Sequence, residues 1–134
     1  MIKGFTCGAS DLLHPGHIAM LGECKSQCGH LYVGLHTDPT IDRPKKNKPV
    51  QTTLERYIQL KHLTLVDEII PCDTEEDLVN LRAILDINKR FVGSDHIDDY
   101  ITGQEIMDKR GIKVVFTTRY HDWSSSELRE RIKK

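Results

Sequence analysis

Short apolar runs alternate along the chain with longer segments in which apolar residues recur every three or four positions. The run LYVGL, residues 31–35, is apolar on both faces, which is typical of a central strand in a parallel sheet. In the segment 16–27 the apolar and small residues share one side of a helix: Ile18, Leu21, Cys24 and Cys28. The pattern therefore predicts that strands and helices alternate from one end of the sequence to the other.

The same pattern predicts five strands, at residues 2–8, 31–35, 67–71, 90–94 and 112–117. It predicts helices at residues 16–27, about 53–63, from the acidic DTEEDL at 73–78 onward, 102–111 and 124–134. Gly111 suits the left-handed residue that follows a helix, and Ser124 with Glu127 forms a capping box. This alternation predicts one doubly wound α/β domain over residues 1–134, with a five-stranded parallel sheet and helices on both faces. In such sheets, ligands bind beyond the carboxyl ends of the strands, where the strand order reverses.

Length and charge narrow the possible functions. The 134 residues suit one domain, and 38% hydrophobic with 29% charged residues is ordinary for a soluble globular protein. The formal net charge of −1 provides no global positive field, which argues against extended nucleic-acid binding. No apolar run is long enough to span a bilayer, and the opening MIKGFTCGAS lacks the layout of a signal peptide, so we expect a cytoplasmic location.

The cysteines are expected to be free thiols, because no secretory signal points to an oxidising compartment: Cys7, Cys24, Cys28 and Cys72. Cys24 and Cys28, with His30 nearby, leave a metal site open, but no second ligand pair follows at zinc-site spacing. Two small residues four apart on a helix are equally expected in a core, and we favour that interpretation.

The stretch SDLLHPGH, residues 10–17, lies between the first predicted strand and the first predicted helix, where a ligand is expected. Pro15 suits a first helical position, and Gly16 lets a ligand approach the backbone closely. His14 and His17 are three residues apart, so both rings can face the same side of the helix start. The N–H groups of the first turn and the helix dipole favour an anion there. We therefore expect the two imidazoles to donate hydrogen bonds to phosphate oxygens.

A second anion site is expected at the far end of the sheet. Arg119 follows the fifth predicted strand, and three hydroxyls begin the last helix, at Ser124, Ser125 and Ser126. A guanidinium fork, hydroxyls and a helix N-terminus together favour phosphate, although Ser124 also suits an ordinary N-cap. If the first and last strands lie side by side, the two sites share one ligand. The basic loop RPKKNK, residues 43–48, is either a solvated loop or a lid over the phosphates.

The familiar glycine-rich phosphate motifs, G-x-x-x-x-G-K and G-x-G-x-x-G, are absent from the sequence, and no motif marks a nucleophile with its base. Transfer of a nucleotidyl group needs neither. An incoming phosphate monoester is already anionic, so the enzyme mainly positions the groups and neutralises developing charge.

Two motifs carry a resemblance to a known family. CGASDLLHPGH, residues 7–17, resembles the His-x-Gly-His signature of the nucleotidyltransferase superfamily. RYHDWSSSEL, residues 119–128, resembles its second signature, an Arg followed by a Ser/Thr-rich helix start. With TLERYIQLKHLTLVDEIIP and FVGSD, the resemblance covers nearly the whole chain and is greatest to glycerol-3-phosphate cytidylyltransferases. It implies a Rossmann-like domain that transfers CMP from CTP to a phosphoalcohol, releases pyrophosphate, uses Mg²⁺ with the nucleotide and forms a homodimer.

The resemblance also implies roles for individual residues. It assigns catalysis to His14, His17, Lys45, Lys46 and Arg119. It assigns nucleotide binding to Gly8, Ala9, Ser10, Asp11, Gly16, Asp95, Arg119, Ser124, Ser125 and Ser126. Lys45 and Arg56 are implied to hold the acceptor.

The chain departs from the family pattern at three places. Ser10 stands where the family usually has Phe, and RYHDWSSS replaces Arg-Thr-Glu-Gly-Ile-Ser-Thr-Thr in a part that lies near the base. After DEIIP the chain has CDTEEDL, an acidic stretch that repels a phosphate unless it points away. These departures keep other acceptors open, namely phosphocholine and phosphoethanolamine. They also keep open an adenylyltransferase that uses ATP with a sugar phosphate or flavin phosphate, and a nucleotide-binding module without catalysis.

Overall fold

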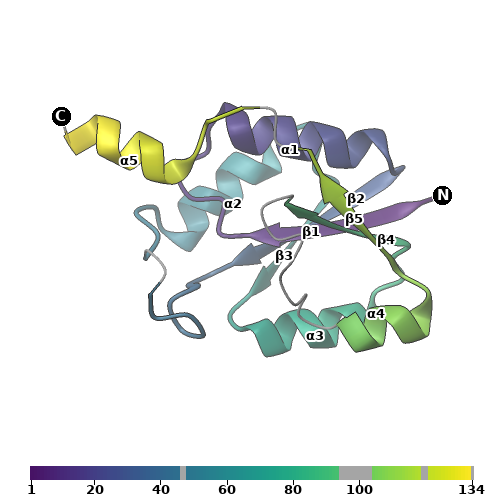
Figure 1. Ribbon diagram of the computed structural model, residues 1–134. Coiled ribbons are helices and arrows are strands. Elements are labelled where there is room, and N and C mark those ends of the chain that lie inside the picture. Colours follow the sequence, from purple (N-terminus) through teal and green to yellow (C-terminus); the bar gives the residue numbers. More distant parts are fainter. Residues whose placement is uncertain (46–47, 94–103, 119–120, 134) are drawn as a thin grey trace.

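In the computed structural model the strands form one parallel sheet of five strands in the order β3-β2-β1-β4-β5 (Figure 1). The structure describes residues 1–45, 48–93, 104–118 and 121–133. The strands are β1 (Lys3–Gly8), β2 (His30–His36), β3 (Glu68–Cys72), β4 (Lys89–Gly93) and β5 (Lys113–Thr117). The helices are α1 (Pro15–Ser26), α2 (Thr53–Lys61), α3 (Glu75–Ile84), α4 (Gln104–Arg110) and α5 (Ser125–Lys133). The predicted fold class is confirmed, and the element ends differ from the expected ones by a few residues.

Local sequence explains where several helices begin and end. The side chain of Thr52 accepts from the backbone N–H of Glu55, whose side chain accepts from Thr52 in return, and Thr74 with Asp77 does the same for α3. Gly111 follows α4 with a φ of 71°, the left-handed conformation expected of it.

Helices cover both faces of the sheet: α1 and α2 lie on one face, and α3 and α4 on the other (Figure 1). Each face has its own core. Leu21 of α1 and Leu60 of α2 pack with alternate β2 residues such as Val33. Leu78 of α3 and Met107 of α4 belong to the core of the opposite face. None of the helices in the described part of the chain is long and apolar enough to cross a membrane.

The strand order corrects one expectation. β1 pairs with β2 and β4, and β5 pairs with β4, so β4 separates the first strand from the last. The strand order reverses between β1 and β4, because the chain first builds outward through β2 and β3 and then crosses back. The carboxyl ends of β1 and β4 therefore lie beside each other at one edge of the sheet.

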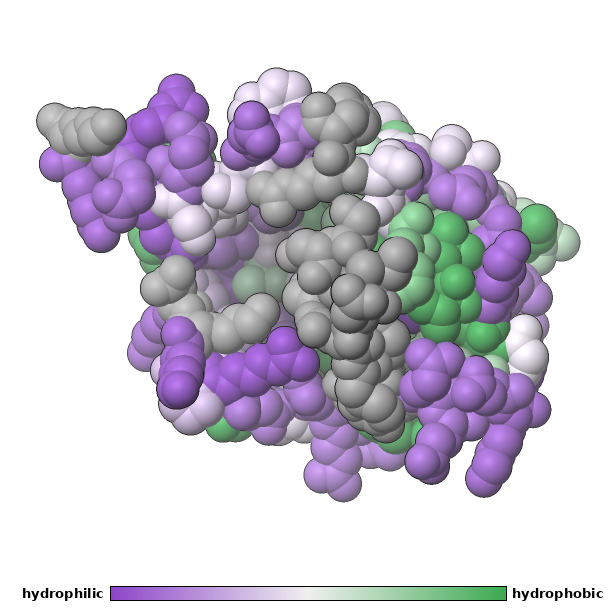
Figure 2. Space-filling model, in the orientation of Figure 1, coloured by the Kyte–Doolittle hydropathy of each residue, from purple (hydrophilic) through white to green (hydrophobic). Residues whose placement is uncertain are grey.

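Hydrophilic residues cover most of the face seen in Figure 2, interrupted by an apolar area. α5 lies at the upper left of both views, reaches beyond the sheet and shows mainly hydrophilic residues (Figures 1 and 2). None of its residues is buried, so its position depends on polar contacts rather than on core packing.

Candidate functional site

The turn between β1 and α1 is strained. Ser10 and Leu12 have φ angles of 53° and 52°, which are unfavourable for residues with a Cβ atom. Asp11 between them accepts hydrogen bonds from the N–H groups of Val50 and Gln51, both at 2.9 Å. The side chain of Gln51 accepts in return from the N–H of Leu12 at 2.8 Å. These contacts from the residues before α2 hold the turn in its strained shape.

The two histidines of the turn cap α1. The Nδ1 atom of His14 accepts from the N–H of Gly16 at 3.0 Å, and the Nδ1 atom of His17 accepts from the N–H of His14 at 3.2 Å. The ring centroids lie 4.0 Å apart. Because both Nδ1 atoms accept, each neutral ring carries its proton on Nε2. The capping arrangement thus places the donor group of each ring at Nε2.

Burial lowers the pKa of His17 to about 4, with the charge of His14 acting in the same direction and that of Asp11 opposing it. His17 is therefore a neutral imidazole at neutral pH. A neutral ring with its proton on Nε2 is a hydrogen-bond donor, as the phosphate interpretation of the sequence requires.

A cavity of about 220 Å³ lies beside these histidines. Its lining comes from the start of α1, the ends of β4 and β5, and the segment leading into α5: His14, Gly16, His17, Met20, Gly93, Thr117, Thr118, His121, Trp123, Ser124 and Ser125. Residues from both expected anion sites, namely His14 and His17 of the first and Ser124 and Ser125 of the second, therefore line one cavity, although β1 and β5 are not neighbours. The N-terminal ends of α1 and α5 bring these residues together.

The first turn of α5 is fixed through Asp11. Ser125 Oγ donates to the backbone carbonyl of Asp11 at 2.9 Å, and Arg129 lies 2.6 Å from its carboxylate. Ser124 Oγ accepts from the N–H of Glu127 at 3.0 Å, so Ser124 is an N-cap as expected. Ser126 is exposed. One aspartate therefore joins the histidine turn, the start of α5 and the residues before α2.

Asp11 itself was expected among the nucleotide-binding residues, but its carboxylate faces protein. The residue is 4% exposed. Burial alone raises the pKa of the carboxyl, yet the N–H groups of Gln51 and Val50 and the guanidinium of Arg129 outweigh it and hold the pKa below its ordinary value. Asp11 thus acts on the site by positioning its parts.

Arg56 also lies elsewhere than expected for an acceptor-binding residue. It is 1% exposed. Its guanidinium donates to the carbonyls of Ala9, His36 and Thr37. It also donates to the carbonyls of Gln51 and Thr52, just before α2, and to the hydroxyl of Thr53. These contacts use its donors on backbone oxygens that end β1 and β2, so Arg56 holds the strand ends together rather than facing a ligand.

The glycines and small residues of the turn have distinct surroundings. A Cβ atom on Gly16 lies 2.7 Å from Cε1 of His14 and 3.0 Å from Cε1 of His121, so only glycine fits between the rings. Gly8 ends β1, and Ala9 supplies the carbonyl that Arg56 contacts.

Arg43, the first residue of the basic loop RPKKNK, contacts the acidic stretch CDTEEDL at the start of α3. Arg43 lies 2.6 Å from Glu75, whose N–H donates to Asp42 at 2.6 Å. Thr37 Oγ1 donates to Asp73 at 2.6 Å. Lys45 is exposed in this loop. Three expected site residues lie outside the described residues: Lys46, Asp95 and Arg119.

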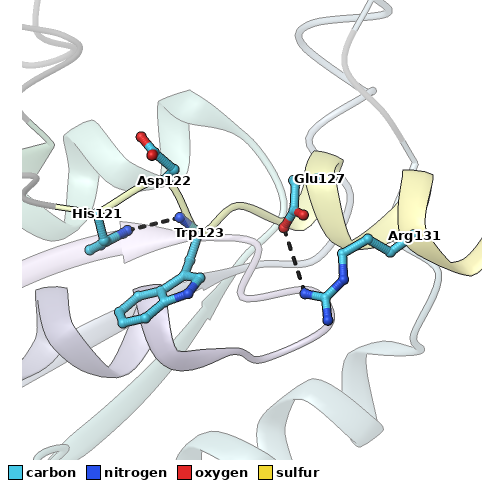
Figure 3. A pocket seen from close by; sticks show the side chains of 5 residues that line it. All are labelled: His121, Asp122, Trp123, Glu127 and Arg131. Atoms are coloured by element: carbon cyan, nitrogen blue, oxygen red, sulfur yellow. Dashed lines mark hydrogen bonds and ion pairs between the residues drawn. The ribbon is translucent and has the colours of Figure 1, made fainter.

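Sequence reasoning missed several residues near the cavity. Both carboxylate oxygens of Glu23 accept from the N–H of Thr118, at 2.8 and 3.1 Å, and Thr118 Oγ1 also donates to Glu23. This contact ties α1 to the end of β5, and no local pattern announces it. His121 and Trp123 stack with ring centroids 4.9 Å apart (Figure 3). Trp123 is the only tryptophan in the sequence, which was an available signal.

The cysteines carry no site in the described residues. None of the four, all of which lie in the described ranges, forms a disulfide. Cys28 donates to the carbonyl of Cys24, whose thiol has its pKa raised to about 12 by burial. No group of three or more histidine, cysteine or acidic side chains within the described ranges is arranged to hold a metal ion.

A family model described as "Cytidylyltransferase-like" matches residues 5–131. The chain is 34% identical over 126 residues to "Bifunctional protein HldE" of Caulobacter sp. strain K31, covering 93% of this chain and 26% of that relative. The chain therefore spans about a quarter of the length of the curated relatives that it matches.

Solved structures share the fold. A lipopolysaccharide core biosynthesis protein from Thermoplasma volcanium has a TM-score of 0.69 at 24% identity, covering 90% of this chain and 99% of that one. A pantoate-beta-alanine ligase from Francisella tularensis, complexed with beta-gamma ATP and beta-alanine, has a TM-score of 0.55 at 14% identity, covering 98% of this chain and 69% of that one.

Proposed function

The chain belongs to the cytidylyltransferase-like family, and from that premise we propose that it is a nucleotidyltransferase that moves AMP from ATP to a sugar phosphate. A phosphate oxygen of the acceptor bonds to the α-phosphorus of ATP. The bond from that phosphorus to the bridging oxygen breaks, and its electron pair leaves with pyrophosphate. The observation that carries the proposal is the single cavity in which His14 and His17 face the start of α5.

The chain's own groups suit this chemistry. The Nε2–H groups of His14 and His17 donate to phosphate oxygens as negative charge grows on them, and Ser124 and Ser125 at the start of α5 line the same cavity. Neither histidine acts as a base, because the acceptor phosphate is already an anion. The depressed pKa of His17 keeps its ring a neutral donor during turnover at neutral pH.

ATP and a sugar phosphate are supported by the proteins that this chain resembles. One neighbour in fold is a lipopolysaccharide core biosynthesis protein, which points to saccharide chemistry, and another was solved with an ATP analogue. The curated relative is a bifunctional protein of which this chain matches one part. None of these names mentions glycerol phosphate or a cytidine nucleotide.

Transfer of CMP from CTP to glycerol 3-phosphate is the second candidate, favoured by the description of the family model and by the motif resemblance. The acidic stretch does not weigh against a phosphorylated acceptor, because Asp73 and Glu75 are engaged by Thr37 and Arg43. Phosphocholine and phosphoethanolamine are further acceptors to be tested.

Mg²⁺ is proposed to enter with the nucleotide. Among its described residues, the cavity lining offers hydroxyl oxygens at Thr117, Thr118, Ser124 and Ser125 but no carboxylate. Such a lining fits an ion held mainly by the phosphates that it accompanies. When bound, the ion neutralises charge on the triphosphate. A homodimer, implied by the resemblance, is likewise proposed and is tested by light scattering.

Pyrophosphate release is the test, with ATP and CTP each crossed against sugar phosphates, glycerol 3-phosphate, phosphocholine and phosphoethanolamine. Release with ATP and one sugar phosphate supports the proposal, and release only with CTP transfers it to the second candidate. Nucleotide binding without release from any pair supports a non-catalytic module.

Variants of the histidines test the mechanism. His14→Asn and His17→Asn keep a capping acceptor near Nδ1 but lack the Nε2–H donor, so we expect each to lower kcat by about 10²- to 10³-fold. His62→Asn, at an exposed histidine that ends α2, is the matched control and keeps the full rate. An undiminished rate in folded His17→Asn contradicts the mechanism.

A further inference from the structure

The stacked rings of His121 and Trp123 separate two cavities. Both residues line the cavity of about 220 Å³ beside His14 and His17, called the inner cavity below. Both also line an outer cavity of about 490 Å³, together with Asp122, Glu127 and Arg131 (Figure 3). A ligand whose phosphates occupy the inner cavity and whose remaining part extends into the outer cavity therefore contacts this ring pair.

The ring pair is held in place by short local contacts. The planes of the two rings are inclined by only 25°, and the Nδ1 atom of His121 accepts from the backbone N–H of Trp123 at 3.1 Å. Ser124, the next residue, is the N-cap of α5, so the indole is fixed at the rim of the proposed phosphate site. A preorganised aromatic surface of this kind loses little conformational freedom when a ligand binds.

The indole is also unusually accessible for its size. Trp123 is 46% exposed, although a large aromatic side chain stabilises a fold most when it is buried. Figure 3 shows the indole extending from the chain on the same side as the His121 ring, while the carboxylate of Asp122 points away. The exposed ring lies against both cavities rather than on an unrelated surface.

We propose that Trp123 is a specificity-determining residue whose indole, backed by His121, stacks on the base of the nucleoside triphosphate. This inference rests on the proposed function and adds the part of the site that recognises the nucleoside. The two-ring face of adenine covers more of an indole than the single ring of a pyrimidine, so the platform favours ATP over CTP and UTP. Stacking of one base on an aromatic side chain corresponds to roughly a tenfold gain in affinity or more.

Because Trp123 is the only tryptophan, its fluorescence reports on this position alone. The wild-type protein is titrated with ATP, UTP, inorganic tripolyphosphate and a hexose phosphate, with excitation at the red edge of the indole band and binding followed in parallel by calorimetry. We expect ATP to quench the emission strongly, UTP weakly, and tripolyphosphate to bind with little change.

Two variants complete the test. Trp123→Ala is expected to weaken ATP binding about tenfold while leaving tripolyphosphate binding unchanged, and Trp123→Phe to recover most of the loss. Equal quenching by ATP and tripolyphosphate, or quenching by the hexose phosphate instead of ATP, overturns the inference and leaves the proposed function standing. If neither ATP nor tripolyphosphate binds, both the inference and the proposed function are wrong.

Discussion

The ion pair between Asp11 and Arg129 is expected to couple the stability of the fold to the geometry of the site. The two residues are 118 positions apart, and their closest atoms lie 2.6 Å from each other. The carboxylate also accepts two backbone N–H groups from the segment before α2. The perturbation we choose is Asp11→Asn, which keeps the shape of the side chain but removes its charge and one acceptor.

The expected loss in the free energy of unfolding is about 3 kcal/mol. Breaking a buried ion pair costs roughly 3–5 kcal/mol, and the 21% exposure of the Arg129 side chain places this pair at the low end. The amide also leaves one buried N–H without a charged acceptor, which costs roughly 1–3 kcal/mol and is part of the same total. Arg129→Met leaves both backbone contacts intact, so we expect it to cost only about 1 kcal/mol.

Urea unfolding of wild type, both single variants and the double variant gives the coupling between the two residues. We expect a coupling free energy of about 1 kcal/mol, with the double variant little worse than Asp11→Asn alone. Asp122→Asn, at an exposed position of the adjoining segment, is the control and stays within about 0.5 kcal/mol of wild type. Additive losses in the double variant, or a loss under 1 kcal/mol for Asp11→Asn, refute the reasoning.

The same variants report on acid sensitivity and on the site. Because the pKa of Asp11 is held below its ordinary value, its contribution to stability is present above the ordinary carboxyl pKa and is lost as the pH falls through the depressed one. Asp11→Asn is therefore expected to lose less stability on acidification than wild type. Under conditions where it stays folded, the variant should also have a lower kcat/KM, because Arg129 of α5 loses the charged partner that holds this helix against the histidine turn.

Three further predictions concern the walls of the cavity. The pKa of His17 is lowered to about 4 by burial, so the unfolded chain takes up a proton at a higher pH than the folded protein does. The free energy of unfolding should therefore fall between pH 6.5 and about 4, by at most about 3 kcal/mol. In urea unfolding at several pH values, His17→Gln should lack this fall. Gly16→Ala should displace the ring of His14 and lower kcat at least tenfold with little change in far-UV circular dichroism, and a normal kcat contradicts the close packing. Glu23→Gln should loosen Thr118 and raise the KM for the nucleotide a few-fold in steady-state assays, whereas an unchanged KM means that this contact does not position the site.

Much of the fold and the local chemistry of the turn could be predicted from the sequence. Short apolar runs indicated the five strands, because burial of a strand on both faces leaves a continuous apolar run in the sequence. Longer segments with a period of about 3.6 indicated the helices of the described residues, because a helix buries one face. His14, Gly16 and His17 lie within one turn at the start of α1, and Ser124 caps α5. Such contacts span only a few residues, so spacing alone predicts them.

Tertiary structure decided which distant parts meet. Strand periodicity does not say which strand lies beside which, and the insertion of β4 between β1 and β5 follows only from the pairing. The family resemblance implied a ligand contact for Arg56, whereas the fold buries its side chain and directs its guanidinium to backbone carbonyls. The contacts of Asp11 with Arg129 and of Glu23 with Thr118 join segments about a hundred positions apart. Their partners are chosen by the packing of whole elements, which no local pattern of side chains specifies.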